Sequence, residues 1–406
     1  MSPSRPRGDL GAAGEELLRP IVARYDGSAF DAPPGVSRLR LTVAGDQSER
    51  SWDVCISRRD ARLEPARTSL RPDAVLRAGA ATWRDIAADV RAGMAAFGAR
   101  RLRIRGNLHL AVGFLAATAA AEDGRLLVHS VPTRRGTIST LEAGRGEPLL
   151  LLHGLGATKA SFLPTVAALA GDYRVIAADL PGFGDSHKPF PAPYDAPFLA
   201  RSALRLLDTL GLERVHLAGH SLGGRVALEL GFRHPERLRS LTLITPSMAW
   251  RRTRPWAPWL RLVRPELGFL QPAPRILVEP LVRRLVPGGQ GGWTAVAVDE
   301  FLRAFSQPRG RAAFYAAARA IYLEDSGDEA GFWNDLRHLT PPALFIWGRH
   351  DQLVPIGFER HAAEAAPRAR HVELDCGHVP QLECPQALHA AMRRFLAAHR
   401  ERTAAA

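Results

Sequence analysis

Two kinds of hydrophobic pattern divide the chain. Early in the sequence, apolar and polar residues alternate over residues 38–44 and again over residues 51–57. This period of two is typical of strands with one buried face, and two such strands in succession favour antiparallel pairing. Residues 82–93 and 108–118 instead place their apolar side chains on one helical face. We therefore expect a small α+β domain over residues 1–125.

Local signals refine this domain. Thr82 is expected to cap the first of these two helices, because its hydroxyl can accept a hydrogen bond from the first turn. Gly106-Asn107 predicts a turn before the second helix. A short helix within residues 15–23 is expected to be interrupted by Pro20.

The rest of the chain carries continuous apolar runs of strand length. They occupy residues 148–152, 174–178, 215–218, 241–244 and 343–347, and a last strand is expected at residues 371–374. Runs that are apolar on both faces indicate strands covered on both sides. Since helical patterns separate them, residues 126–406 predict an α/β domain with a doubly wound, mostly parallel sheet. The charged, Gly- and Pro-containing residues 121–136 are expected to join the two domains.

The sheet pattern lapses between residues 246 and 336, where we expect a helical cap. Residues 250–284 carry eight arginines against two glutamates, with tryptophan, leucine and phenylalanine interspersed. This composition is typical of a surface for anionic membranes or amphipathic substrates. More often, such a composition occurs in a cap whose apolar side chains pack on the core while its arginines stay solvated. Residues 287–292, Pro-Gly-Gly-Gln-Gly-Gly, are expected to let two parts of the cap move.

Charge narrows the classes of partner. The net charge of +13 comes from arginine, since Lys159 and Lys188 are the only lysines. No basic tract is interleaved with stacking aromatic residues, so nucleic-acid binding is not expected. The basic surplus favours anionic lipid headgroups, and peripheral membrane contact is a possible consequence.

The cysteines and the N-terminus bear on the compartment. Cys55, Cys376 and Cys384 are too few and too irregularly spaced for a disulfide framework or a zinc site. No apolar core of signal-peptide length occurs near the N-terminus, and the longest nearly apolar run, residues 108–121, is too short to span a bilayer. We expect a cytoplasmic protein without a transmembrane helix.

One motif predicts a nucleophile. The strand expected at residues 215–218 ends in Gly219-His220-Ser221-Leu222-Gly223, and a helical stretch follows. This is the G-x-S-x-G elbow, in which Gly219 and Gly223 permit a sharp strand-to-helix turn that a side chain would obstruct. The turn presents the hydroxyl of Ser221 at the N-terminus of the helix.

A serine needs a base to remove its proton, and the base needs an acid to fix its tautomer. Asp351 and His378 each follow a predicted strand, and polar residues at the carboxyl ends of parallel strands gather at one edge of the sheet. The order Ser221, Asp351, His378 is the order of this class of site. His220 is expected to pack and hydrogen-bond rather than act as the base.

The oxyanion of the tetrahedral intermediate needs two donors. Leu222, the residue after the nucleophile, supplies one backbone N–H, and the loop His153-Gly154-Leu155-Gly156 supplies the other, with Leu155 as the favoured donor. His153 has a second possible role, which is to brace this loop by hydrogen bonds. The chemistry of these residues implies no metal and no organic cofactor.

The N-terminal pattern resembles a known family. The segments that carry the resemblance are PDA (72–74), WRDI (83–86), GMAAF (93–97) and LRIRGN (102–107). They resemble the sterol-carrier-protein lipid-transfer family over about residues 15–120. The resemblance implies a sheet and helices around an apolar tunnel for sterols or fatty acyl chains. The alternative is that most of these apolar residues are simply core.

The C-terminal motifs resemble the α/β-hydrolase family over about residues 126–400. The matching segments are HGLG (153–156), DLPGFGDS (179–186), GHSLGG (219–224) and those around Asp351 and His378. Because the nucleophile is a serine, the haloalkane dehalogenase and epoxide hydrolase chemistry of relatives with an aspartate is not expected.

The resemblance implies a serine hydrolase that cleaves a carboxylic ester or thioester of an apolar substrate, such as a lipid, acyl or sterol derivative. One alternative is the cofactor-free C–C bond hydrolysis of diketones, which relatives perform with the same three residues. A second is a lipid-binding or transfer protein in which the hydrolase domain is a scaffold. The sequence leaves the oligomeric state open.

Overall fold

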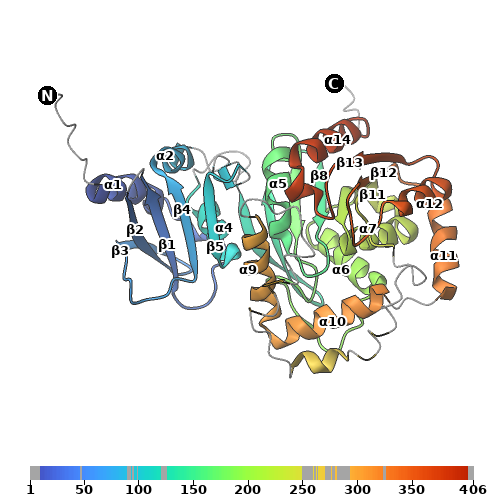
Figure 1. The fold of residues 1–406 in the computed structure, drawn as a ribbon, viewed down its shortest axis with the longest axis horizontal. Helices are drawn as coiled ribbons and strands as arrows, with labels where there is room; N and C mark the ends of the chain where they lie inside the picture. Colours follow the sequence, from blue (N-terminus) through green and yellow to red (C-terminus); the bar gives the residue numbers. More distant parts are fainter. Residues whose placement is uncertain are drawn as a thin grey trace. The chain divides into compact units, whose positions relative to one another are not determined.

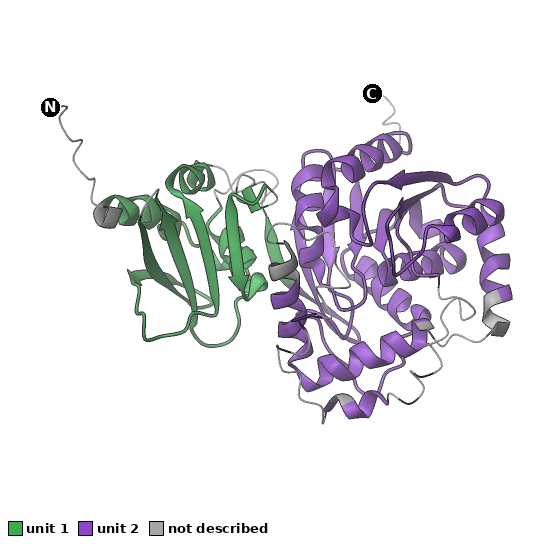
Figure 2. Ribbon diagram, in the orientation of Figure 1, with its two compact units in different colours: residues 1–129 green, residues 130–406 purple. Residues whose placement is uncertain are grey.

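The computed structural model describes residues 10–45, 48–88, 93, 96–97, 99–119, 126–248, 259, 262, 264–269, 276, 279–280, 293–322 and 326–400. The chain forms two compact units (Figure 2). Unit 1 comprises residues 1–129 and unit 2 comprises residues 130–406.

Unit 1 is built on a five-stranded sheet with the strand order β3-β2-β1-β4-β5 (Figure 1). The strands are β1 (Ser37–Ala44), β2 (Glu49–Ile56), β3 (Ala61–Pro65), β4 (Ala74–Gly79) and β5 (Leu102–Gly106). Strand β1 pairs antiparallel with β2, as the alternation predicts, and parallel with β4. Leu39, Leu41 and Val43 of β1 are all buried, so the apolar positions of the pattern face the core.

The helices of unit 1 correct two expectations. The described residues contain α1 (Leu10–Ala23), α2 (Ala80–Ala88) and α4 (Leu108–Ala117), with a short 3-10 helix η1 (Gly27–Ala29). Pro20 does not interrupt α1, since the helix continues through it and buries Leu18 and Ile21. Thr82 does not cap α2 but lies buried inside it, because the helix begins directly after β4. Asn107 caps α4 by accepting the N–H of Leu110 at 3.1 Å.

An eight-stranded sheet forms the core of unit 2, in the order β13-β12-β11-β10-β8-β9-β7-β6. The strands are β6 (Leu127–Thr133), β7 (Gly136–Ala143), β8 (Pro148–Leu152), β9 (Arg174–Ala178), β10 (Val215–His220), β11 (Leu238–Ile244), β12 (Ala343–Gly348) and β13 (Arg370–Leu374). Neighbours from β9 to β13 run parallel, and β7 runs antiparallel to β9. The sheet is therefore mostly parallel, as predicted.

The described part of the segment expected to join the domains, residues 126–136, is mostly a strand. Residues 127–133 form β6 at the edge of the large sheet, next to β7. Pro132 is compatible with this position because an edge strand has N–H groups that face away from the sheet. The mixed polar composition of β6 hides the strand from a search for apolar runs.

Helices flank the strands of unit 2. They are α5 (Leu163–Leu169), α6 (Ala196–Thr209), α7 (Leu222–Arg233), α12 (Gly357–Ala365), α13 (Pro380–Glu383) and α14 (Pro385–Ala397), with 3-10 helices η2 (Lys159–Phe162) and η3 (Pro235–Arg237). Strands β10 and β12 are buried at every position, as expected for strands covered on both faces.

The strand order places the functional edge of the sheet. Strand β8 lies between β9 and β10, so the chain leaves β8 toward one side of the sheet for β9 and later returns to its other side for β10. At such a switch point the loops after two neighbouring strands diverge and leave a crevice at their carboxyl ends. The loop after β8 begins with His153, and the residue after β10 is Ser221.

The described part of the expected cap is helical. It contains η6 (Pro265–Phe269), α9 (Trp293–Phe305), α10 (Pro308–Tyr322) and α11 (Ser326–Arg337), and η6 packs on α10. The expectations for the Gly-rich residues 287–292 and for most of the arginines in residues 250–284 concern positions outside the described residues. Within the described ranges, no helix combines the length and the apolar character that crossing a membrane requires.

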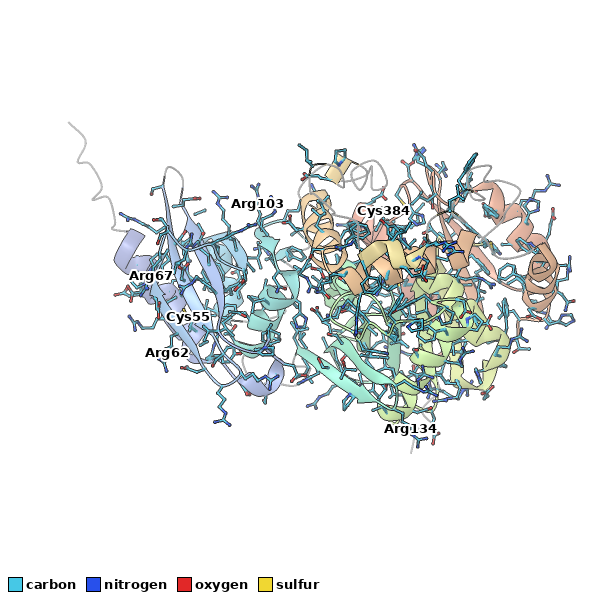
Figure 3. All side chains as sticks on the ribbon, turned by 90° about the horizontal axis from the view of Figure 1, so that it is seen from below. Cys55, Arg62, Arg67, Arg103, Arg134 and Cys384 are labelled. Carbon is cyan, nitrogen blue, oxygen red and sulfur yellow. The ribbon has the colours of Figure 1, made fainter. Side chains whose placement is uncertain are left out.

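Figure 3 labels several of the arginines and two of the cysteines. Arg62 lies on β3 and Arg103 on β5, at opposite edges of the unit 1 sheet, while Arg134 lies between β6 and β7. Arg62 and Arg103 are therefore separated by the width of the unit 1 sheet. Cys55 lies on β2 and Cys384 follows α13, and all three cysteines of the chain are free.

Candidate active site

The turn between β10 and α7 has the geometry of a nucleophile elbow. Ser221 adopts φ 51° and ψ −112°, a backbone conformation that costs energy for a residue with a side chain and recurs at functional sites. A Cβ atom on Gly219 would lie 2.2 Å from the carbonyl oxygen of Gly223, and one on Gly223 would lie 2.1 Å from that of Leu152. Both glycines of the motif are therefore required by close backbone contacts.

Asp351 and His378 meet at the carboxyl ends of β12 and β13. The Nδ1 of His378 lies 2.7 Å from Oδ2 of Asp351, and both side chains are buried. The other carboxylate oxygen, Oδ1, accepts the backbone N–H groups of Leu353 and Val354 at 2.7 and 2.9 Å. These bonds fix the carboxylate, so His378 carries its proton on Nδ1 and leaves Nε2 as the acceptor.

The elbow and the His378 loop lie against one another. The rings of His220 and His378 are 5.0 Å apart between centroids. The backbone N–H of Ser221 donates to Ile244, and the hydroxyl of Thr245, the next residue, donates to the carbonyl of His378 at 3.0 Å. In the described part of the chain the hydroxyl of Ser221 makes no hydrogen bond. The structure thus brings the three predicted residues to one edge of the sheet, with a direct bond between Asp351 and His378.

His220 supports the backbone of His378. Its Nε2–H donates to the His378 carbonyl at 2.7 Å, beside the bond from Thr245. Burial, together with the nearby His378, lowers the pKa of His220 to about 3. A histidine with this pKa and an occupied Nε2 is a scaffold rather than a base, which is the role that its position in the motif predicts.

Glu383 holds the same loop from its other side, and sequence reasoning missed it. Its Oε2 accepts the N–H of Gly377 and its Oε1 accepts the N–H of Val379, both at 2.8 Å. One carboxylate thus binds the two backbone amides that flank His378. The only signal in the sequence is a glutamate five residues after the histidine, which is too common to single out.

The loop after β8 lies beside the nucleophile. A Cβ atom on Gly154 would lie 3.2 Å from the Cβ of Ser221 and 2.8 Å from Nδ1 of His220. His153 is fully buried, donates from Nδ1 to the carbonyl of Gly154 at 2.8 Å and accepts the N–H of Leu180 on Nε2 at 2.9 Å. Burial lowers its pKa, so it is neutral and braces the loop.

The two residues predicted to bind the oxyanion flank this contact. Leu222 is the first residue of α7, and the first N–H groups of a helix have no partner within the helix. Leu155 follows Gly154, and the turn is closed by a bond from the N–H of Ala157 to the carbonyl of Gly154 at 3.1 Å. Leu222 therefore follows Ser221 along the backbone, and Leu155 follows Gly154, which lies against Ser221.

Comparison with known families agrees with this geometry. Residues 147–385 match the family described as alpha/beta hydrolase fold. The chain belongs to the α/β-hydrolase family. Residues 29–117 of unit 1 match the SCP-2 sterol transfer family, so the protein joins a domain of that family to the hydrolase.

Curated relatives of the hydrolase differ in their substrates. The chain is 34% identical to a putative carbamate hydrolase, RutD, of Pseudomonas savastanoi over 61% of this chain and 93% of the relative. It is 32% identical to a pimeloyl-[acyl-carrier protein] methyl ester esterase of Aeromonas hydrophila, over 64% of this chain and 99% of the relative. It is 31% identical to a 2-hydroxymuconate semialdehyde hydrolase of Pseudomonas putida, over 63% of this chain and 89% of the relative.

A solved structure shows the same architecture. A membrane phospholipase A described as a bacterial virulence factor is similar at a TM-score of 0.55 and 29% identity. The match covers 68% of this chain and 87% of that one. The family and the comparisons establish a hydrolase, while the named substrates range from carbamates to lipids.

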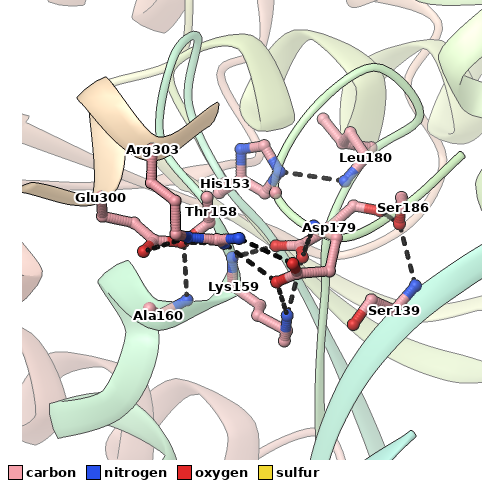
Figure 4. Close-up of polar contacts among 12 residues, drawn as sticks. Ser139, His153, Thr158, Lys159, Ala160, Asp179, Leu180, Ser186, Glu300 and Arg303 are labelled. Carbon is pink, nitrogen blue, oxygen red and sulfur yellow. Dashed lines mark hydrogen bonds and ion pairs between the residues drawn. The ribbon is translucent and has the colours of Figure 1, made fainter. Parts of the chain in front are cut away.

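A buried charged network lies behind the β8 loop of the hydrolase (Figure 4). The Lys159 Nζ donates to Oδ2 of Asp179 at 2.7 Å, and the Lys159 backbone N–H donates to Oδ1 at the same distance. Burial opposes both charges, but their mutual attraction outweighs it, since the pKa of Asp179 is lowered and that of Lys159 is raised. Asp185 adds its backbone N–H to Asp179 and its carboxylate to Lys159.

Aromatic side chains of the cap form one cluster. Phe301 and Phe305 of α9 stack at 5.1 Å between centroids, and Phe314 of α10 contacts both rings edge-on at 5.6 and 5.5 Å. All three rings are only half-buried. Phe301 also lies against Gly156, where a Cβ atom would be 2.7 Å from the ring. These three rings form an apolar, partly exposed aromatic wall, which contacts Gly156, the residue after Leu155.

Proposed function

We propose that the protein is a serine hydrolase that cleaves a carboxylic ester or thioester of an apolar substrate through an acyl-enzyme. The hydrogen bond between Asp351 and His378, beside Ser221 on a strained elbow, is the observation that carries this proposal. Asp351 holds the imidazole with Nε2 free to accept a proton. Neutral His220 is not a competing base.

The geometry supports a two-step reaction. Ser221 attacks the substrate carbonyl and gives its proton to Nε2 of His378, while the N–H groups of Leu155 and Leu222 bind the oxyanion. His378 then protonates the departing alcohol or thiol, which leaves the acyl group on Ser221. In the second step His378 takes a proton from water, the hydroxide attacks the acyl-enzyme, and the acid leaves as Ser221 regains its proton. Neither step requires a cofactor.

Three observations support an apolar substrate. The half-buried rings of Phe301, Phe305 and Phe314 lie near the proposed oxyanion donors and suit an acyl chain. Two of the similar proteins are named for cleaving an acyl-carrier methyl ester and a phospholipid. Unit 1 matches a family described by sterol transfer, which fits a lipid, acyl or sterol-like ligand.

Turnover of esters of graded acyl length tests this function. We expect the full chain to hydrolyse p-nitrophenyl esters and the Ser221→Ala variant to lose nearly all of this activity. Ser202→Ala is the matched control, because Ser202 lies in α6 and bonds to the carbonyl of Phe198. Absence of turnover across the series in the wild type, or undiminished turnover in Ser221→Ala, would overturn the proposal.

A second candidate function is the C–C bond hydrolysis of a diketone. It is favoured by the relative named for hydrolysis of 2-hydroxymuconate semialdehyde, whose name contains no ester. A ring-fission diketone and an ester of similar size, assayed side by side, separate the two functions by their ratio of kcat/KM. Tight lipid binding without turnover of either substrate would instead favour a lipid-binding or transfer protein.

A further inference from the structure

The cap helix α9 touches the proposed oxyanion loop directly. Gly156 has φ +73°, and a Cβ atom there would lie 2.7 Å from the ring of Phe301 and 3.1 Å from that of Phe314. Gly156 follows Leu155, the proposed donor. The loop therefore takes its shape with two cap rings pressed against its backbone, and a side chain at position 156 would not fit between them.

Two residues further along α9, Arg303 makes a second contact with the core. Its guanidinium binds both carboxylate oxygens of Asp185, at 2.7 and 2.9 Å. Glu300 holds the guanidinium in place at 2.7 and 3.1 Å, and Figure 4 labels both Glu300 and Arg303. A two-point bond between a guanidinium and a carboxylate fixes orientation as well as distance. Arg303 is mostly buried, with 18% of its side chain exposed, so solvent screens this bond less than a surface pair.

From Asp185 the contacts lead back to the oxyanion loop. The Asp185 carboxylate lies 3.4 Å from Nζ of Lys159, and its backbone N–H donates to Asp179 at 2.9 Å. Asp179 in turn accepts the backbone N–H of Lys159, three residues after Gly156. Arg303 and Phe301 thus hold the segment 156–159 at its two ends, one through charges and one through a ring.

The lysine content of the chain supports a specific role for this network. Arginine supplies all but two of the 54 basic residues, and both lysines, Lys159 and Lys188, belong to it. The Lys188 Nζ donates to the carbonyls of Gly184 and Ser186, on either side of Asp185, at 2.7 and 3.1 Å. A compact ammonium fits such enclosed sites, whereas a planar guanidinium needs a wider one.

We propose that Arg303 is a positioning residue that makes docking of α9 a condition for a formed oxyanion loop. The proposal rests on the proposed serine hydrolase function. When Arg303 is bound to Asp185, the chain of contacts through Lys159 and Asp179 holds the loop beside Ser221. When that bond is lost, the loop loses one of its two supports from the cap, and catalysis slows at the step that needs the oxyanion donors.

Steady-state kinetics of Arg303→Gln and Asp185→Asn test the proposal. We expect kcat to fall about 10- to 100-fold in each, which is less than the roughly 100- to 1,000-fold loss when an oxyanion donor is removed outright. The KM for an acetyl ester, which is too short to reach along the aromatic wall, should change little. Arg303→Lys, which keeps the charge but not the two-point bond, should recover part of kcat. The double variant should lose no more kcat than the less active of the two single variants, because both substitutions break the same bond.

Arg309→Gln is the matched control, since Arg309 is an exposed arginine at the start of α10 in the same cap. Its kcat should equal that of the wild type. A kcat for Arg303→Gln equal to that of Arg309→Gln would overturn the proposal. So would a double variant whose loss is the product of the two single losses.

Hydrogen–deuterium exchange tests the coupling without relying on turnover. In the full chain, Arg303→Gln should speed exchange of the backbone amides of residues 154–162, while Arg309→Gln should not. Unchanged exchange there would refute the coupling even if the enzyme is active. Faster exchange in a protein without Ser221-dependent turnover would keep the coupling and refute only the proposed function.

Discussion

The loop that carries His378 and the loop that carries Leu155 reach the same site but are held by different forces. The His378 loop is fixed by hydrogen bonds to its own backbone, from His220 and Thr245 on one side and to Glu383 on the other. The Leu155 loop is backed by the buried ion pair of Lys159 and Asp179. The first support lies within the core of unit 2, whereas the second extends into the cap.

We propose that this difference separates the parts that do the chemistry from the parts that respond to substrate. A base must keep its distance to the nucleophile in every state, and short hydrogen bonds within the core achieve this. An oxyanion loop that depends on a cap helix can instead be formed only when the cap is closed, as in enzymes whose lids complete the site. The following substitutions break one support at a time.

The largest effect is expected from Asp351→Asn. The amide oxygen would keep the N–H groups of Leu353 and Val354, so the NH2 group would face Nδ1 of His378 and donate to it. This favours the wrong tautomer of His378, and kcat should fall about 10⁴-fold, as in other triads. Thermal unfolding should change little, since the side chain keeps its size. Asp375→Asn is the control, because Asp375 lies in the same loop region but is exposed and bonded to His350. Equal activity of the two variants would contradict the assignment of the acid.

Removing one charge of the buried pair should cost the most stability. In Lys159→Met the carboxylate of Asp179, whose side chain is fully buried, would lose its cation, and the free energy of unfolding should fall by about 3–5 kcal/mol. Chemical denaturation measures this. The double variant Lys159→Met/Asp179→Asn should recover part of the loss, because no unpaired charge remains and the amide oxygen still accepts a backbone N–H. A single variant as stable as the wild type would contradict the role of the pair.

A smaller effect is expected from Glu383→Gln. The amide keeps one acceptor oxygen, so one of the two N–H groups beside His378 loses its partner. We expect kcat/KM to fall by about 10-fold, which is close to the free energy of one hydrogen bond to a charged group. Glu364→Gln, at an exposed ion pair on α12, is the control. If the His378 loop tolerates Glu383→Gln as well as the control, its backbone is held without this carboxylate.

Near neutral pH, the smallest effect is a change in the pH dependence of stability. The pKa of His220 falls from 6.5 to about 3 on folding, so between these values the unfolded chain binds a proton that the folded chain does not. Stability is therefore lost as pH falls through this window, by up to about 1.4 kcal/mol per pH unit from this residue. His220→Asn, which retains a donor for the His378 carbonyl, should show a shallower loss. An unchanged slope would show that His220 is not the group that titrates.

The sequence predicts those features of the site that depend on local patterns of residues. The glycines of the elbow, the serine between them, and the acid and base after consecutive strands follow from spacing alone. Lys159 and Arg303 are not predictable in this way, because their partners lie 20 and 118 residues away and only the folded chain brings them together. Glu383 binds amides only four and six residues away, but a glutamate at that spacing is too common to single out. The helix through Pro20 is not predictable either, since burial of Leu18 and Ile21 overrides the local signal of the proline. Strand β6 has a mixed polar composition and only one buried residue, so it lacks the apolar run that marks the central strands of the sheet.

Reaction with a fluorophosphonate tests the central claim most directly. The probe mimics the tetrahedral intermediate and bonds only to a serine activated by its base. Peptide mapping by mass spectrometry should find one adduct, on Ser221, and its formation should be slowed greatly in His378→Ala. A full chain that stays unlabelled, or one labelled at another serine, would contradict the assignment of Ser221 as the nucleophile.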